Sequence, residues 1–220
     1  MALDMQITPF VEWNHGVAAA LVEGVLRDGG VAAVPTDTVY GLVCDARNED
    51  AVRRMFAMKK RIQEKAFPIF VKDIAAARYY VYISDAKARF LEKVWPGAVT
   101  VVFRHKQKLP AILTGGRDTL GIRVPDHPLL RELLARLDPP AGGPLAHTSA
   151  NISAQPPAKN AEEVKRYFEG AGGEPDLIID GGALQGAAST VIDFTGAEPI
   201  ILRAGPVSKQ DLDALLSRGG

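Results

Sequence analysis

Three cationic side chains, Lys59, Arg61 and Lys65, fall within seven positions of the sequence. An arginine presents a planar fork to phosphate oxygens and a lysine presents a point charge, so together they could bind a polyanion. They also follow a segment that predicts a helix, and cations at a helix end offset its dipole. The cluster alone therefore predicts either an anion site or a solvated helix end.

Two stretches of small polar residues follow predicted buried strands. Residues 35–42, PTDTVYGL, come directly after the apolar run 31–34, and residues 148–151, TSAN, follow the apolar residues 145–146. Hydroxyl and amide groups at strand ends are typical of ligand sites in α/β proteins. The alternative for each stretch is a turn that uses small polar residues. Near the C-terminus, Ser189 adds a further hydroxyl and Arg203 a further cation at predicted strand ends.

Arg123 stands between apolar residues of a predicted strand at 120–124. Burying a charge without a partner is costly, so we expect this guanidinium to be paired. A ligand carboxylate and a structural ion pair are both compatible with the sequence.

Other candidate motifs favour structural roles. The glycines of the segment 181–186 have phosphate-loop spacing, but no lysine follows and the next predicted element is a strand, which indicates a strand-to-strand turn. The four histidines show no metal-ligand spacing, and His127 before Pro128 indicates a helix start. Cys44, the single cysteine, is expected to be a buried apolar residue. No metal site built from the protein's own side chains is predicted.

A scaffold of alternating helices and strands is needed to position these residues. Helices are predicted at 16–27, 51–60, 75–82 and 86–94, from 128 onward, and around 212–216. Strands are predicted at 31–34, 69–71, 99–103, 120–124, 145–148, 177–180, 190–194 and 200–203, with a surface loop at 138–144. The alternation predicts the α/β class, and the late strands without helices between them predict a mixed sheet.

Apolar spacing assigns faces to two of these helices. Val17, Leu21 and Val25 share one face of the first helix. Val52, Met55 and Phe56 are expected to turn the second helix toward the core.

Bulk composition narrows the functional classes. The chain has 220 residues, of which 47% are hydrophobic, which suits one large domain, expected to span 1–220 with its core at about 13–206. The 26 basic and 26 acidic residues cancel, which argues against coating nucleic acid by bulk charge. A single cysteine, no leader-like segment and no bilayer-length apolar run predict a cytoplasmic protein that does not enter membranes.

In their order, the motifs resemble the family of threonylcarbamoyl-AMP synthases of the YrdC/Sua5 type, from about residue 31 to 205. The family's patterns P-T-[DE]-T-x-Y-G-L, W-P-G-x-x-T, R-x-P-x-H-P, S-A-N-x-S, S-T-[VI]-[IV]-D and R-x-G are met at 35–42, 95–100, 123–128, 149–153, 189–193 and 203–205. Its cationic pattern K-x-R-P-x-x-K-P-L-P falls at 59–68, with Ile62 and Ala66 in place of prolines. Phe70 stands where some members carry a histidine near the threonine.

The resemblance implies a twisted mixed sheet flanked by helices, with a deep, positively charged cavity. It implies that L-threonine is bound by Thr38, Arg123, Ser149 and Ser189. It implies that ATP is bound by Arg61, Lys65, Thr119, Asn151, Lys159 and Arg203, and that Lys59 and Tyr40 line the same cavity. Because the sequence ends soon after Arg203, it resembles the short form of the family, with the YrdC-like domain alone.

The activity implied is that of a nucleotidyltransferase, an L-threonylcarbamoyladenylate synthase that uses L-threonine, bicarbonate and ATP. The threonine amine captures bicarbonate or carbon dioxide, the resulting carbamate attacks the α-phosphorus of ATP, and pyrophosphate leaves. Mg²⁺ is expected as a cofactor held chiefly by the ATP phosphates. The product is implied to pass to a separate transferase complex that modifies adenosine 37 of tRNA, and weak RNA binding is a secondary expectation.

Three alternatives remain open from the sequence. A protein of the same fold could bind a nucleotide or RNA without making the adenylate. The related carbamoyl-transfer domain of hydrogenase maturation is a second alternative, although it normally lies in a longer chain with zinc-finger cysteines. A scaffold protein is the third, and the density of motifs argues against it.

Overall fold

A single mixed sheet organises the chain, and the computed structural model describes residues 7–9, 15–62, 65–137, 143–208, 210–212 and 214. The sheet has ten strands in the order β1-β8-β2-β3-β7-β4-β6-β5-β9-β10. The strands are β1 (Ile7–Pro9), β2 (Ala32–Val34), β3 (Gly41–Asp45), β4 (Ile69–Phe70), β5 (Val99–Arg104), β6 (Thr119–Arg123), β7 (Leu145–Ser149), β8 (Leu177–Asp180), β9 (Thr190–Asp193) and β10 (Ile200–Arg203). The sheet contains parallel pairs such as β4·β6 and β5·β9 and antiparallel pairs such as β3·β7 and β5·β6, which confirms the predicted mixed α/β sheet.

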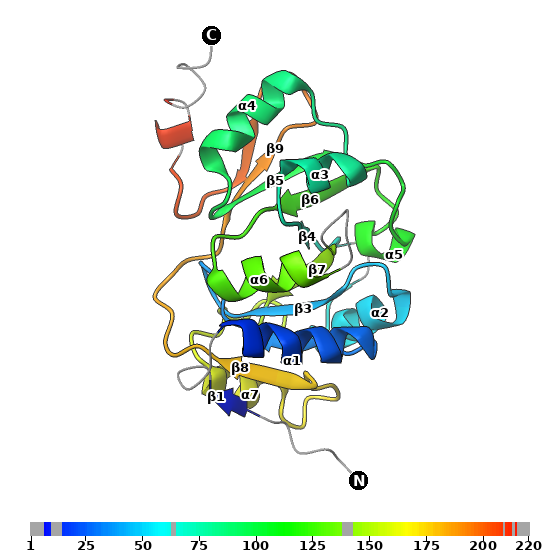
Figure 1. The fold of residues 1–220 in the computed structure, drawn as a ribbon, viewed down its shortest axis with the longest axis vertical. Coiled ribbons are helices and arrows are strands. Elements are labelled where there is room, and N and C mark those ends of the chain that lie inside the picture. Colours follow the sequence, from blue (N-terminus) through cyan, green and yellow to red (C-terminus); the bar gives the residue numbers. More distant parts are fainter. Residues whose placement is uncertain are drawn as a thin grey trace.

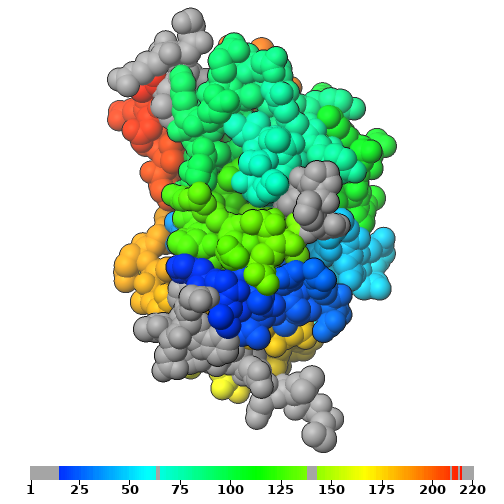
Figure 2. Space-filling model, in the orientation of Figure 1, coloured from blue at the N-terminus to red at the C-terminus, as the bar shows by residue number. Residues whose placement is uncertain are grey.

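Helices cover the sheet. They are α1 (His15–Arg27), α2 (Glu49–Met58), α3 (Ile74–Tyr80), α4 (Asp85–Val94), α5 (Ala111–Thr114), α6 (Pro128–Arg136) and α7 (Ala161–Phe168). Helices α1, α3, α4 and α6 lie in front of the strands in the view of Figure 1. Figure 2 shows α1 and α6 side by side on that surface, where they also contact each other. None of the helices in the described part of the chain has the length and apolar character needed to cross a bilayer.

Helix α2 carries the predicted cationic cluster at its C-terminal end. Asn48 caps its N-terminus by accepting hydrogen bonds from the backbone N–H groups of Asp50 and Ala51. Its residues Val52, Met55 and Phe56 are buried, as predicted. The helix ends at Met58, and Lys59 is its C-cap residue, whose N–H donates to Met55 O.

The first helix buries a different face from the one that Val17 and Leu21 share. Val17 and Leu21 are 41% and 38% exposed. The buried face of α1 is formed by Ala18, Ala19, Val22 and Leu26. The neighbours of α1 include α6 and strands β2, β3 and β8.

Three internal elements were not predicted: strand β3, the short helix α5 and helix α7. Strand β3 begins inside the polar motif, at Gly41, and its first four residues are all buried, so it shows no alternation of buried and exposed residues. Helix α7 has a polar surface, and its signal is a capping pair, in which Asn160 accepts from Glu163 N and Glu163 accepts from Lys159 N. Most of the predicted loop at 138–144 and much of the predicted helix around 212–216 lie outside the described residues.

The glycine-containing segment 181–186, predicted as a strand-to-strand turn, is part of a longer strand-to-strand connection, residues 181–189. It joins β8 to β9, which are far apart in the strand order. Tyr40 Oη fastens its beginning by accepting from Gly181 N and donating to Gly182 O, both at 2.8 Å. Gly186 then packs against Thr38 so closely that a Cβ there would lie 2.0 Å from the Thr38 carbonyl oxygen. This segment, 181–189, is called the strap below.

Candidate active site

Side-chain alternation gathers the polar candidates on one face of the sheet. Phe70 of β4 pairs in register with Arg123 of β6 and with Leu145 of β7. Because alternate residues of a strand share a face, His147 and Ser149 lie on the same face as Arg123. This face forms the wall of a cavity of about 390 Å³.

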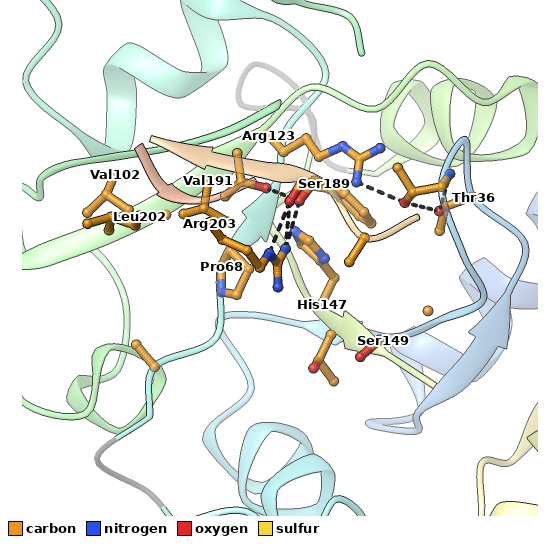
Figure 3. A pocket seen from close by; sticks show the side chains of 18 of the residues that line it. Thr36, Pro68, Val102, Arg123, His147, Ser149, Ser189, Val191, Leu202 and Arg203 are labelled. Atoms are coloured by element: carbon orange, nitrogen blue, oxygen red, sulfur yellow. Dashed lines mark hydrogen bonds between the residues drawn. The ribbon is translucent and has the colours of Figure 1, made fainter. Parts of the chain in front are cut away.

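The polar residues that line the cavity are mostly arginines and hydroxyl-bearing side chains, and apolar residues such as Phe70 and Val191 line the rest (Figure 3). Its arginines are Arg61, Arg117, Arg123 and Arg203, and Asp193 is the one carboxylate among the described lining residues. Hydroxyl groups come from Thr36, Thr38, Thr100, Thr119, Thr148, Ser149 and Ser189. The fold thus brings together all the residues predicted to bind threonine, with Arg61, Thr119 and Arg203 from the set predicted to bind ATP.

Thr38 is positioned by a turn that Thr36 closes. The Thr36 hydroxyl donates to Val39 O at 2.7 Å and accepts from Thr38 N at 3.0 Å. It also lies 2.9 Å from the Thr38 hydroxyl. A threonine that bonds its own turn in this way fixes the backbone without help from a regular element. The Thr38 side chain therefore has a fixed place at the end of β2.

Arg123 is buried, with 2% of its surface exposed, and each nitrogen of its fork has a contact. Nε donates to Gly97 O at 2.9 Å and Nη1 to the Thr38 hydroxyl at 3.1 Å. Nη2 and Asp37 Oδ1 form an ion pair at 2.6 Å, at an angle outside hydrogen-bond geometry. Burial lowers the pKa of Arg123, and Asp37 opposes that shift. The structural ion pair left open by the sequence is present, and the guanidinium still lines the cavity.

Lys59 lies behind the cavity wall, although it was expected to line the cavity. Its ammonium donates to Ser149 O at 2.7 Å, Asn151 O at 2.6 Å and Asn151 Oδ1 at 2.7 Å. An ammonium has three N–H groups, so none is left for a phosphate in this geometry. Burial, with a smaller contribution from Arg61, lowers the pKa of Lys59 to about 7. Lys59 therefore fixes the turn that presents Ser149, whose hydroxyl donates to Asn151 Oδ1 at 2.6 Å.

Arg61 holds the loop in which two family prolines are replaced. Its Nε donates to Lys65 O at 2.9 Å and its Nη2 to Ala66 O at 3.0 Å. Its guanidinium also lies over the ring of Phe67, 5.1 Å from the ring centroid. These contacts restrain a loop that lacks the rigidity of proline, and Arg61 still reaches the cavity.

Ser189 and Arg203 form a second polar wall on strands from the other end of the sheet. Arg203 donates to Ser189 O through Nη2 at 2.8 Å and to the Ser189 hydroxyl at 3.2 Å. The Ser189 hydroxyl also lies 2.9 Å from that of Thr100. Burial lowers the pKa of Arg203, and the charge of Arg123 lowers it further. Arg61 is affected in the same way by burial and then by Arg203, so the charge of Arg203 repels both of the other guanidiniums.

Some predicted residues lie away from the cavity wall. Tyr40 is fully buried, and its hydroxyl fastens the strap and does not line the cavity. Asn151 is also buried, where it accepts the hydrogen bonds of Lys59 and Ser149. Lys65 and Lys159 are exposed and outside the cavity lining, so their predicted contacts with ATP remain predictions.

The structure adds residues that were not predicted as part of the site. His147 and Arg117 line the cavity, as does Asp193 at the end of β9. The signal for His147 was available, since it lies two residues before Ser149 on one strand. Arg117 lies in an irregular segment between α5 and β6, where the sequence shows no periodicity that would indicate its direction.

Known proteins share both the sequence pattern and the fold. A family model described as telomere recombination, Sua5_yciO_yrdC, matches residues 24–205. The chain belongs to the Sua5/YciO/YrdC family. A protein of Pyrococcus abyssi (strain GE5 / Orsay) named threonylcarbamoyl-AMP synthase is 34% identical over 207 residues, which cover 93% of this chain and 58% of that protein. A protein of the same name from Halorhodospira halophila (strain DSM 244 / SL1) is 40% identical over 157 residues, 71% of this chain and 78% of that protein.

The fold is shared with a solved structure of the family. The crystal structure of P. abyssi Sua5 complexed with L-threonine matches with a TM-score of 0.86 and 30% identity, covering 97% of this chain and 61% of that one. This family member therefore spans less than two thirds of the length of the P. abyssi protein. The comparisons confirm the resemblance that the motifs indicated and the twisted α/β sheet that it implied.

Proposed function

We propose that this chain is an L-threonylcarbamoyladenylate synthase, which forms threonylcarbamoyl-AMP and pyrophosphate from L-threonine, bicarbonate and ATP. One observation carries the proposal most strongly. Arg61, Arg123 and Arg203 are brought to one cavity although their charges repel, and Asp193 is the one carboxylate among its described lining residues. An anionic ligand would relieve that repulsion, so the cavity suits a carboxylate and a polyphosphate together.

Threonine fits the part of the cavity around Arg123. The guanidinium would pair with the threonine carboxylate, and the hydroxyls of Thr38, Ser149 and Ser189 line the same space. The relatives named threonylcarbamoyl-AMP synthase and the P. abyssi Sua5 structure with L-threonine support this placement. Asp37 already contacts Arg123, so it would hold the fork in place for the substrate.

ATP would bind toward Arg61 and Arg203, with Arg117 as a further cation at the cavity wall. The carbamate formed on the threonine nitrogen attacks the α-phosphorus, and the bond to pyrophosphate breaks. Catalysis of this kind needs positioning and neutralisation of charge, and the guanidiniums supply both without a protein nucleophile.

Mg²⁺ is proposed as a cofactor because the proposed reaction uses ATP. No cluster of three or more metal-ligating side chains occurs among the described residues, and Asp193 is the lining residue whose carboxylate could contact the ion. Mg²⁺ commonly uses one or two carboxylates and substrate phosphates, so this donor set fits an ion bound mainly by ATP. When bound, it would neutralise charge on the phosphates.

The proposed activity also implies what uses the product and where the enzyme works. The product would pass to a tRNA-modifying transferase complex that acts on adenosine 37, and the enzyme would work in the cytoplasm. Weak RNA binding is only a secondary part of the proposal, because a net charge of zero gives the protein no general attraction to nucleic acid.

Pyrophosphate release tests the proposal. The wild type should release pyrophosphate only when ATP, threonine and bicarbonate are all present. Arg61→Ala should reduce the rate at least about 100-fold, because a cation at the phosphates and the support of its loop are lost together. Arg131→Ala is the control, since Arg131 is 64% exposed in a surface ion pair and should keep wild-type activity. ATP binding by the wild type without pyrophosphate release would favour a binding protein of the same fold.

A further inference from the structure

His147 is a buried histidine whose imidazole has no hydrogen-bond partner among the described residues. It lies on β7, is 8% exposed, and lines the cavity next to Arg203 and Ser189 in the view of Figure 3. Neither ring nitrogen is hydrogen-bonded to a described residue, and Nε2 is enclosed without a partner. A buried polar atom left unpaired costs about 1–3 kcal/mol, so its persistence in a cavity wall indicates a partner that arrives with the ligand.

The ring is held in place by stacking. Its plane lies 3° from that of Phe70, with the ring centroids 3.5 Å apart. Arg123 lies near the same Phe70 ring, 5.6 Å from its centroid. Because the imidazole makes no hydrogen bond, a half-turn about Cβ–Cγ keeps the stack and exchanges its nitrogens with its carbons. Either nitrogen can therefore face a ligand without the loss of a contact.

The surroundings keep this imidazole neutral. Burial lowers the pKa of His147 well below its usual value, and the charges of Arg123 and Arg203 lower it further. A neutral imidazole has one N–H group and one lone pair. Because its pKa is lowered, the His147 imidazole is a poor general base. Its lone pair is still an uncharged hydrogen-bond acceptor between two cations.

The proposed reaction needs an acceptor of this kind. The amino group must be uncharged to attack the carbon of bicarbonate or carbon dioxide, and its remaining N–H groups must still be oriented. Arg123 and Arg203 can only donate, whereas the Ser149 hydroxyl, which gives its proton to Asn151, and the neutral imidazole of His147 can each accept. We infer that His147 is a positioning residue for the amino group of the amino-acid substrate, accepting a hydrogen bond from it. This inference rests on the proposed function, because it takes threonine as the substrate.

Two substitutions separate the hydrogen bond from the packing. His147→Phe keeps a flat ring against Phe70 and removes the acceptor. His147→Gln removes the aromatic stack and offers an amide oxygen in place of the imidazole lone pair. The probes are L-threonine and (R)-3-hydroxybutanoate, which is threonine without its amino group. Affinities are measured by calorimetry for threonine and as competitive inhibition of pyrophosphate release for the analogue.

The expected pattern is selective. His147→Phe should weaken threonine binding about tenfold, which corresponds to one lost hydrogen bond, and should leave the KM for ATP and the inhibition by the analogue within about twofold. His147→Gln should retain threonine affinity within about threefold. Equal weakening of threonine and the analogue, no weakening in His147→Phe, or equally weak threonine binding in both variants would overturn the inference. If the wild type neither binds threonine nor releases pyrophosphate, the proposed function has failed instead.

Discussion

Replacing Gly186 by alanine should damage the threonine site from a distance. The new Cβ would lie 2.0 Å from the Thr38 carbonyl oxygen, whereas ordinary contacts begin at 3.4 Å. The strap or the Thr38 loop must therefore move by about 1.4 Å, and both are tied to the site. Thr38 accepts a hydrogen bond from Arg123, so a shift of the loop also disturbs the guanidinium. A misplacement of about 1 Å can reduce a rate by roughly 100-fold.

The assay is threonine-dependent pyrophosphate release by the purified Gly186→Ala variant. We expect kcat/KM for threonine to fall by about 100-fold while the variant remains folded by circular dichroism. Gly182→Ala is the control in the same strap, because its Cβ would meet nothing within 4 Å. Its φ of +76° costs an alanine about 1 kcal/mol, so its stability should fall slightly and its activity should stay within about threefold. The reasoning is refuted if Gly186→Ala keeps wild-type activity, or if Gly182→Ala loses as much.

Three further predictions concern residues that support the cavity. Burial lowers the pKa of Lys59 from 10.5 to about 7, so between pH 7 and pH 10 the unfolded chain binds more protons than the folded protein. The free energy of unfolding of the wild type, relative to that of Lys59→Met, should therefore rise from pH 7 to pH 10. Urea unfolding at several pH values measures this, and a constant difference would contradict it. Tyr40→Phe should lower the free energy of unfolding by about 1–3 kcal/mol, since Gly181 N and Gly182 O lose their hydrogen-bond partner. An unchanged urea midpoint would show that Tyr40 does not stabilise the strap. Arg123→Lys should raise the KM for threonine at least about tenfold and leave the KM for ATP within about twofold. The reason is that a lysine ammonium lacks the planar fork with which arginine can contact Asp37 and a substrate carboxylate together. Equal effects on both KM values would count against this prediction.

The scaffold was predictable wherever one periodicity dominated. The apolar run before Pro35 and the face formed by Val52, Met55 and Phe56 gave β2 and the buried side of α2. Helix α1 shows the limit of this signal, because Val17 and Leu21 are exposed while Val22 and Leu26 are buried. Valine and leucine occur on both faces, so the apolar pattern alone does not decide which face is buried.

The composition of the site was predictable in part. Residue type and strand position placed Arg123 and Ser149 at the cavity, because side-chain direction alternates along a strand. The role of Lys59 was not predictable, since its three acceptors come from residues about ninety positions away in the chain. The pairing of Asp37 with Arg123 and the unpartnered ring of His147 depend on tertiary contacts in the same way.

Isotope transfer from bicarbonate tests the central claim most directly. The wild-type chain is incubated with ATP, L-threonine and ¹³C-bicarbonate, and the nucleotide products are analysed by mass spectrometry. The account predicts an adenylate that contains threonine and one labelled carbon, formed together with pyrophosphate, and absent when threonine is omitted. Nucleotide binding without a labelled threonine adenylate would contradict it.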